Sequence, residues 1–166
     1  MTVVVLEGSD ASYKSTVAEK LSKMTGFPVI KGSSFELAQC SNDELYHFFT
    51  SLMSLDDIIV DRSIHSNLVY ASLYKDYAIL NDEQVAEIEK TIKRRNIKTV
   101  FLYASPEVIK QRLSVRGDDY VKQDMIEPIL DKYFEVMNKA KVPITSFDTE
   151  QFNSDEIANE LYTYFK

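Results

Sequence analysis

Cysteine, glycine, proline and long apolar runs are all scarce in this sequence of 166 residues. The one cysteine, Cys40, cannot form a disulfide within the chain, and a cysteine-rich zinc site is excluded. The longest early apolar run, residues 3–6, is far shorter than the roughly 20 residues that cross a bilayer, and we expect no signal peptide before it. We therefore expect a cytoplasmic protein that does not bind membranes.

Basic residues are also in the minority. Lysine and arginine number 19 against 26 aspartates and glutamates, which gives a net charge of −7. Proteins that bind long DNA or RNA usually present a basic face to the phosphates, and the longest basic run here is residues 93–95. Long nucleic acid is therefore disfavoured as a partner. The length and the hydrophobic share of 45% are typical of one globular domain, residues 1–166.

Short apolar stretches alternate with amphipathic helical stretches along the chain. The predicted strands are residues 2–7, 28–30, 57–60, 98–103 and 143–147. The predicted helices are residues 15–24, 43–55, 64–78, a helix after the Asn81 cap, 106–116, 121–141 with a kink or restart at Pro128, and 153–165. This order predicts an α/β fold with a five-stranded, mostly parallel sheet and helices on both faces. Ligands of such folds bind beyond the carboxyl ends of the strands.

The segment after the first predicted strand is similar to a phosphate-binding loop, G-x-x-x-x-G-K-[ST]. Gly8, Lys14 and Ser15 match, and Tyr13 replaces the second glycine. We expect Lys14 to reach the β- and γ-phosphates of a nucleotide and the Ser15 hydroxyl to bind Mg²⁺. Main-chain N–H groups would hold the phosphates. The residues expected to bind the nucleotide are Gly8, Ser9, Ala11, Ser12, Tyr13, Lys14, Ser15 and Thr16.

Tyr13 has a conformational cost if position 13 needs a left-handed backbone, since a residue with a Cβ pays about 1–2 kcal/mol there. We expect the loop to form nevertheless, with the Tyr13 ring packed outward or on the nucleotide.

Asp61-Arg62-Ser63 follows the third predicted strand. An acid at this place can hold a Mg²⁺-bound water, and an arginine beside it can bind a substrate phosphate in a bidentate manner.

Two motifs together resemble the thymidylate kinases. Residues 7–16 resemble their E-G-x-D-x-x-G-K-[ST]-[ST] loop, and residues 61–70 resemble D-R-[YFS]-x-x-S-x-x-A-Y, with Val69 in place of the alanine. The resemblance covers nearly the whole chain and implies a three-layer P-loop nucleoside-monophosphate-kinase-like fold, with a homodimer as a further expectation. The sequence departs from the family after the second strand. The Phe-Pro-x-Arg segment is replaced by residues 31–35, which contain Lys31 but no arginine.

The resemblance also implies roles for particular residues. A lid around residues 112–122 would place Arg112 and Arg116, which share one helical face, over the transferring phosphoryl group. The implied catalytic residues are Lys14, Asp10, Asp61, Arg62, Arg112 and Arg116. The implied substrate-binding residues are Asp10, Phe48, Arg62, Ser66 and Tyr70. For Phe48, base stacking and plain core packing are equally compatible with its helical spacing. Phe49, His47, His65 and Cys40 are not expected to bind ligands.

These observations favour a nucleotide kinase that transfers the γ-phosphoryl group of Mg·ATP to a deoxynucleoside monophosphate such as dTMP. One alternative is a deoxynucleoside kinase acting on a sugar hydroxyl, with Glu7 or Asp61 as the base. Another is a nucleotide-binding protein without turnover, which the degenerate loop and the missing arginine suggest. A GTPase switch is disfavoured, because the chain lacks an N-K-x-D-like segment and Asp61-Arg62 is not the start of a D-x-x-G motif. The expected cofactors are ATP and Mg²⁺, and the expected partner is a small nucleotide.

Overall fold

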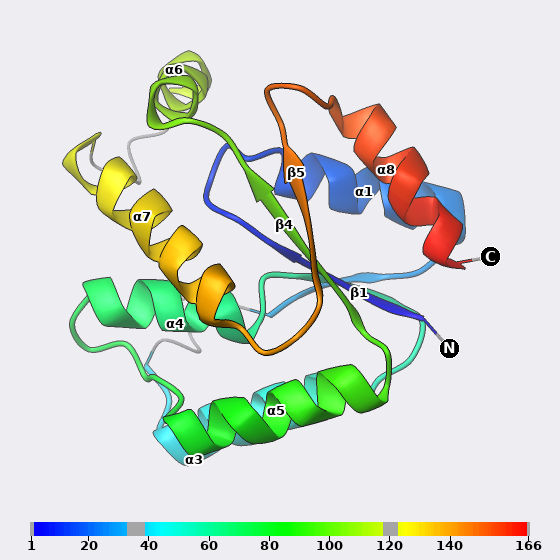
Figure 1. The fold of residues 1–166 in the computed structure, drawn as a ribbon, viewed down its shortest axis with the longest axis vertical. Coiled ribbons are helices and arrows are strands. Elements are labelled where there is room, and N and C mark those ends of the chain that lie inside the picture. The colour runs from blue at the N-terminus through cyan, green and yellow to red at the C-terminus, as the bar shows by residue number, and fades with distance from the viewer. Residues whose placement is uncertain (1, 33–38, 118–122, 166) are drawn as a thin grey trace.

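The chain folds into three layers around a five-stranded parallel sheet (Figure 1). The computed structural model describes residues 2–32, 39–117 and 123–165. The strands are β1 (Val3–Glu7), β2 (Val29–Lys31), β3 (Ile58–Asp61), β4 (Lys98–Tyr103) and β5 (Ile144–Asp148). Their order across the sheet is β2-β3-β1-β4-β5, and every pair is parallel. The predicted fold class is thereby confirmed.

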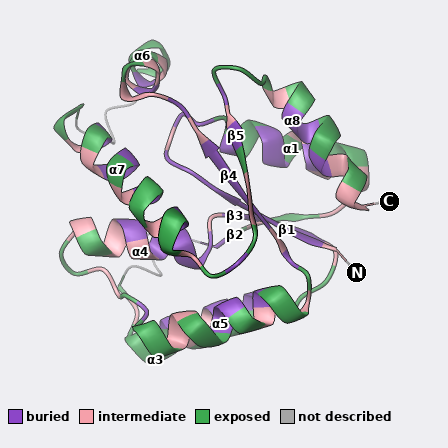
Figure 2. Cartoon of the chain, viewed as in Figure 1, coloured by how far each residue is buried: buried purple, intermediate pink, exposed green. Residues whose placement is uncertain are grey.

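The helices cover both faces of the sheet. They are α1 (Lys14–Thr25), α3 (Asn42–Leu52), α4 (Ile64–Leu73), α5 (Asp82–Arg94), α6 (Pro106–Arg116), α7 (Gln123–Lys139) and α8 (Ser154–Tyr162), followed by a 3₁₀ turn, Thr163–Phe165. Within β1, Val4 and Leu6 pack against α1 and α8 on one face, whereas Val3 and Val5 pack with α3 and α5 on the other. A strand with apolar residues on both sides is buried throughout, as Figure 2 shows for β1.

Several helix ends follow the capping signals in the sequence. The side chains of Asn81 and Asn153 each accept a hydrogen bond from the residue three positions on, and both form capping boxes. Ser105 caps α6, which begins with Pro106. Gly26 ends α1 with a left-handed φ of 77°.

Two predicted helix boundaries are wrong. The helix expected over 43–55 ends at Leu52, and the one expected over 64–78 ends at Leu73, because Tyr74 is extended. No restart divides α7, which continues as one helix through Pro128. Proline at the sixth helical position removes one backbone hydrogen bond near the start of α7, and buried residues on both sides of it hold the helix against the core. Residues 121–122 lie outside the described residues.

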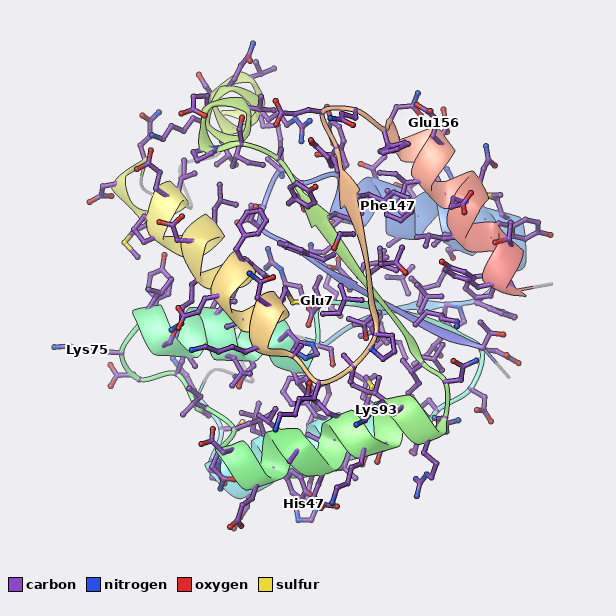
Figure 3. All side chains as sticks on the ribbon, in the orientation of Figure 1. Glu7, His47, Lys75, Lys93, Phe147 and Glu156 are labelled. Atoms are coloured by element: carbon purple, nitrogen blue, oxygen red, sulfur yellow. The ribbon has the colours of Figure 1, made fainter. Side chains whose placement is uncertain are left out.

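The parallel register brings the functional segments to one edge of the sheet. Leu6 of β1 and Lys31 of β2 are both in register with Asp61 of β3. The loop after β1 therefore lies beside the residues that follow β3. Figure 3 shows Glu7, the last residue of β1, in the interior of the molecule, and His47 on its outer surface.

Candidate active site at the carboxyl ends of the strands

The phosphate loop, residues 8–16, joins β1 to α1 and contains two non-glycine residues with left-handed backbones. Ala11 has a φ of 61°, and Tyr13 has φ 67° and ψ 11° directly before Lys14. Gly8 is required for a different reason, since a Cβ there would lie 2.5 Å from the carbonyl oxygen of Leu102. The loop forms with tyrosine in the place of the second glycine, at a cost of about 1–2 kcal/mol.

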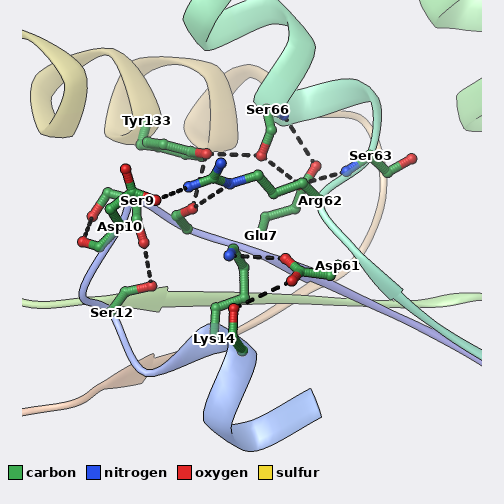
Figure 4. A network of polar contacts seen from close by, with 12 residues as sticks. Glu7, Ser9, Asp10, Ser12, Lys14, Asp61, Arg62, Ser63, Ser66 and Tyr133 are labelled. Carbon is green, nitrogen blue, oxygen red and sulfur yellow. Dashed lines mark hydrogen bonds and ion pairs between the residues drawn. The ribbon is translucent and has the colours of Figure 1, made fainter. Parts of the chain in front are cut away.

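Lys14 and Ser15 both contact the carboxylate of Asp61 (Figure 4). The Lys14 Nζ lies 2.8 Å from Asp61 Oδ1, and the Ser15 hydroxyl donates to Asp61 Oδ2 over 3.3 Å. Burial, together with the nearby Arg62, lowers the pKa of Lys14, and the attraction of Asp61 opposes this shift. The side chains expected to hold phosphate and metal are thus gathered at one point.

Arg62 joins the two strand exits. Its backbone is left-handed, with a φ of 68°. Its guanidinium donates to Asp10 Oδ1 over 2.8 Å and to the Gly8 carbonyl oxygen over 3.3 Å, and lies 5.1 Å from the centre of the Tyr70 ring. The structure therefore brings Asp10, Arg62 and Tyr70 together beside the phosphate loop.

Glu7 is fully buried and anchors the start of α4. Its carboxylate accepts hydrogen bonds from the backbone N–H groups of Ser63, His65 and Ser66 over 2.9, 3.0 and 3.2 Å, and from the Ser66 hydroxyl over 2.7 Å. Burial raises the pKa of Glu7, but these bonds and the nearby His65 outweigh it and lower the pKa overall. Glu7 has no exposed oxygen, so the expectation that it could act as a base is wrong.

Ser66 and His65, both on α4, are buried beside Glu7. Ser66 is fully buried, and its hydroxyl is directed to Glu7 and to the Tyr133 hydroxyl, 2.8 Å away. These contacts connect Ser66 to the support of the phosphate loop, and its role in substrate binding stays a prediction. His65 lies between Glu7 and Glu89, 3.4 Å from each. Burial lowers the pKa of His65, but the two carboxylates raise it overall to about 9, so the ring is protonated at neutral pH.

A cavity of about 260 Å³ opens above the phosphate loop. Its lining residues are Ser9, Asp10, Ala11, Tyr13, Lys14, Ser15, Thr16, Arg112 and Arg116. Gly8 and Ser12 are not among them, and the Ser12 hydroxyl donates to the Ser9 carbonyl oxygen within the loop. Residues of the loop and both arginines of α6 thus line one cavity.

Arg112 differs from the lid arginine that the resemblance implies. Its guanidinium donates to the carbonyl oxygens of Ala11 and Thr149 and to the Thr149 hydroxyl, over 2.9, 3.1 and 2.9 Å, and stacks on the Tyr13 ring at 3.9 Å. It therefore ties α6 to the loop and to the segment after β5. Arg116 is exposed at the end of α6, where Gly117 has a left-handed φ of 69°. Residues 118–122 of the predicted lid lie outside the described residues.

Phe48 is expected either to stack on a base or to pack in the core. Phe48 is half-buried, packed against the apolar cluster of α3 and α5, and meets the Phe49 ring at 5.4 Å. This contact favours core packing, and stacking on a base remains a hypothesis.

Glu7, Tyr133 and Thr149 support the site, and sequence reasoning missed their positioning roles. A glutamate directly before the loop glycine was the one available signal.

The oxygen donors at the loop fit a magnesium ion. Mg²⁺ prefers oxygen ligands and usually binds through one or two protein groups plus substrate phosphates. Ser15 and Asp61 present such oxygens 3.3 Å apart. Within residues 2–32, 39–117 and 123–165, no group of three or more His, Cys, Asp or Glu side chains could hold a metal by itself.

A parallel sheet with a phosphate loop after β1 and an Asp-Arg pair at the end of β3 is typical of P-loop kinases. The model of the deoxynucleoside kinase family matches residues 34–164, and this chain belongs to that family. The match begins after the phosphate loop. No helix in the described part of the chain is long and apolar enough to span a membrane.

One relative matches nearly the whole chain. The chain is 50% identical over 161 residues to the SPbeta prophage-derived uncharacterized protein YorR of Bacillus subtilis, covering 97% of each. A crystal structure of YorR in complex with phosphorylated GDP has a TM-score of 0.93 at 49% identity, covering 98% of this chain and 94% of that one.

Two more distant structures share the fold. A deoxyadenosine kinase from M. mycoides with bound dCTP has a TM-score of 0.62 at 16% identity, covering 98% of this chain and 100% of that one. Thymidylate kinase from Candida albicans has a TM-score of 0.56 at 18% identity, covering 98% and 89%. The likeness to thymidylate kinases thus extends to the fold, whereas the family shown is that of the deoxynucleoside kinases.

Proposed function

We propose that the protein transfers the γ-phosphoryl group of Mg·ATP to the sugar hydroxyl of a deoxynucleoside. The observation that carries this choice of acceptor is the ion pair between Arg62 and Asp10. A monophosphate would bring two negative charges to an arginine that Asp10 already neutralises. A sugar hydroxyl is uncharged, and it needs a base to accept its proton.

Asp10 is the residue we assign as that base. Its side chain is 42% exposed, and Arg62 contacts its Oδ1 atom. Asp61, by contrast, contacts Lys14 through one oxygen and Ser15 through the other. Arg62 would orient the Asp10 carboxylate toward the acceptor while stacking on Tyr70.

The donor side has the charges that phosphoryl transfer requires. Lys14 and Arg116 would bind the phosphates, because charge spreads over their oxygens in the transition state. Ser15 and Asp61 would hold Mg²⁺, which neutralises phosphate charge when bound. Backbone N–H groups at the start of α1 would bind the remaining oxygens.

A deoxynucleoside monophosphate such as dTMP is the second candidate acceptor. Lys31 favours it, because this exposed lysine ends β2 in register with Asp61 and adds a cation on the acceptor side. The relative YorR was crystallised with phosphorylated GDP, so guanine nucleotides belong in any test of donor and acceptor.

An acceptor panel distinguishes these candidates. ADP release from Mg·ATP would be measured with each deoxynucleoside and each deoxynucleoside monophosphate as acceptor. GDP release would be measured in the same way with Mg·GTP as a second donor. We expect turnover with a deoxynucleoside, its loss in Lys14→Met, and its retention in Lys23→Met, a control on the exposed side of α1. Asp10→Asn should lower kcat at least 100-fold, as removal of a general base does.

Two other outcomes of the acceptor panel would contradict the proposed function. Turnover with monophosphates alone would replace the proposed acceptor by the second candidate. Nucleotide binding without turnover on any acceptor would contradict the kinase assignment and favour a non-catalytic nucleotide-binding protein.

A further inference from the structure

Tyr13 occupies a position where its backbone is strained. Its φ of 67° is left-handed, a conformation that glycine adopts at no steric cost. The tyrosine also supplies no side-chain hydrogen bond to the start of α1, although it stands at the N-cap. Strained residues persist where the surrounding structure holds them, and they cluster at ligand sites. The ring is thus the part of Tyr13 to examine.

The Tyr13 ring lies against a fixed arginine and borders the same cavity. The Arg112 guanidinium covers it at 3.9 Å from the ring centre. Three hydrogen bonds to Ala11 and Thr149 hold that guanidinium in place. Tyr13 is nevertheless 38% exposed and lines the cavity above the phosphate loop. A rigid aromatic surface therefore borders the space next to Lys14.

The chemistry of this surface selects one part of a nucleotide. The face of an aromatic ring carries partial negative charge, so it does not attract phosphate. Lys14 and Arg116 line the same cavity and suit the phosphates. A flat, uncharged base is complementary to the ring, since bases stack on aromatic side chains with little dependence on sequence. Of the acceptor-side residues, Asp10 lines this cavity, whereas Arg62 and Tyr70 do not.

We propose that Tyr13, backed by Arg112, is a specificity-determining residue of the donor site, whose ring stacks on the nucleoside part of the phosphoryl donor. The site thereby distinguishes a nucleoside triphosphate from inorganic polyphosphate. This inference rests on the proposed function, because it takes the cavity to be the donor site.

A fluorescent reporter can be placed at this position. The chain contains no tryptophan, so Tyr13→Trp introduces a single one that keeps an aromatic ring. We expect Mg·ATP and Mg·GTP to change its emission, and Mg·tripolyphosphate, which has the phosphates without the base, to leave it nearly unchanged. Tyr46→Trp on α3 is the matched control and should respond to none of the three. An equal response of Tyr13→Trp to ATP and tripolyphosphate would contradict stacking.

Calorimetric binding of the same probes without acceptor gives the second test. Tyr13→Gly removes the ring and relaxes the backbone, and should weaken Mg·ATP binding about tenfold without weakening Mg·tripolyphosphate binding. Tyr13→Phe should restore the preference for ATP. Equal or tighter ATP binding by Tyr13→Gly, or parallel weakening of both probes, would overturn the role of Tyr13. Failure of the wild-type protein to bind ATP or GTP would instead overturn the proposed function.

Discussion

The hydroxyl of Tyr133 donates a hydrogen bond to the carbonyl oxygen of Gly8, 2.9 Å away and 125 residues earlier in the chain. Arg62 donates to the same oxygen over 3.3 Å. Tyr133 is fully buried in α7, so this bond fixes the first residue of the phosphate loop from behind. The loop, the Asp61-Arg62 turn and α7 are therefore one connected support.

Tyr133→Phe removes the hydroxyl and leaves the ring in the core. We expect the free energy of unfolding to fall by about 1 kcal/mol, as for one buried hydrogen bond, and the KM for Mg·ATP to rise several-fold because Gly8 loses a restraint. Chemical denaturation and steady-state kinetics measure the two effects. Tyr46→Phe on α3 serves as the control. An unchanged KM would show that the loop does not depend on Tyr133.

The two arginines of α6 should have separable effects. Arg112 is bonded to Ala11 and Thr149, so Arg112→Ala should raise the KM for ATP. Arg116→Ala should lower kcat at least tenfold with ATP affinity little changed, because its charge is needed mainly in the transition state. Arg94→Ala, on the exposed side of α5, is the control. Equal kcat for Arg116→Ala and wild type would remove Arg116 from the catalytic residues.

Asp61→Asn should weaken the response to magnesium. The substitution removes a charged oxygen beside Ser15 and leaves Lys14 without its 2.8 Å partner. A titration of the reaction rate with Mg²⁺ should show a several-fold higher half-saturating concentration and a kcat at least tenfold lower. Asp43→Asn, an exposed residue of α3, should behave like wild type. A Mg²⁺ dependence identical to wild type would contradict the assigned metal site.

Stability should fall above neutral pH because of His65. Its pKa is raised to about 9 in the folded protein, against about 6.5 when unfolded. The folded state therefore binds more protons, and the stabilisation, complete below pH 6.5, is lost as the pH rises toward 9. Denaturation of wild type should show a slope of up to about 1.4 kcal/mol per pH unit in this window. His65→Gln should lack it, and an equal slope in the variant would exclude His65 as the source.

The sequence predicts the sheet, the phosphate loop and the Asp61-Arg62 turn because these depend on local signals. Buried strands show as apolar runs, and the loop has a recognisable motif. The helix ends at Leu52 and Leu73 were missed, because tertiary packing and not helical periodicity decides them.

The support behind the site could not be read from the sequence. Tyr133 bonds to Gly8 from 125 residues away, and Arg112 bonds both to Ala11, 101 residues earlier, and to Thr149. No sequence pattern encodes such pairings. In the sequence, Glu7 and Ser66 are polar residues that look available to a ligand. In the structure, the buried Ser66 hydroxyl donates a hydrogen bond to the Glu7 carboxylate. Only the fold shows that their polar atoms are already bonded.

The most direct test of the account follows the phosphoryl group itself. The purified protein would be incubated with Mg·[γ-³²P]ATP and each deoxynucleoside or monophosphate, and the labelled product identified by chromatography. We expect label on a sugar hydroxyl of a deoxynucleoside, and no transfer by Lys14→Met. Label found only in diphosphates would contradict the proposed acceptor, and no labelled nucleotide with any acceptor would contradict phosphoryl transfer by this site.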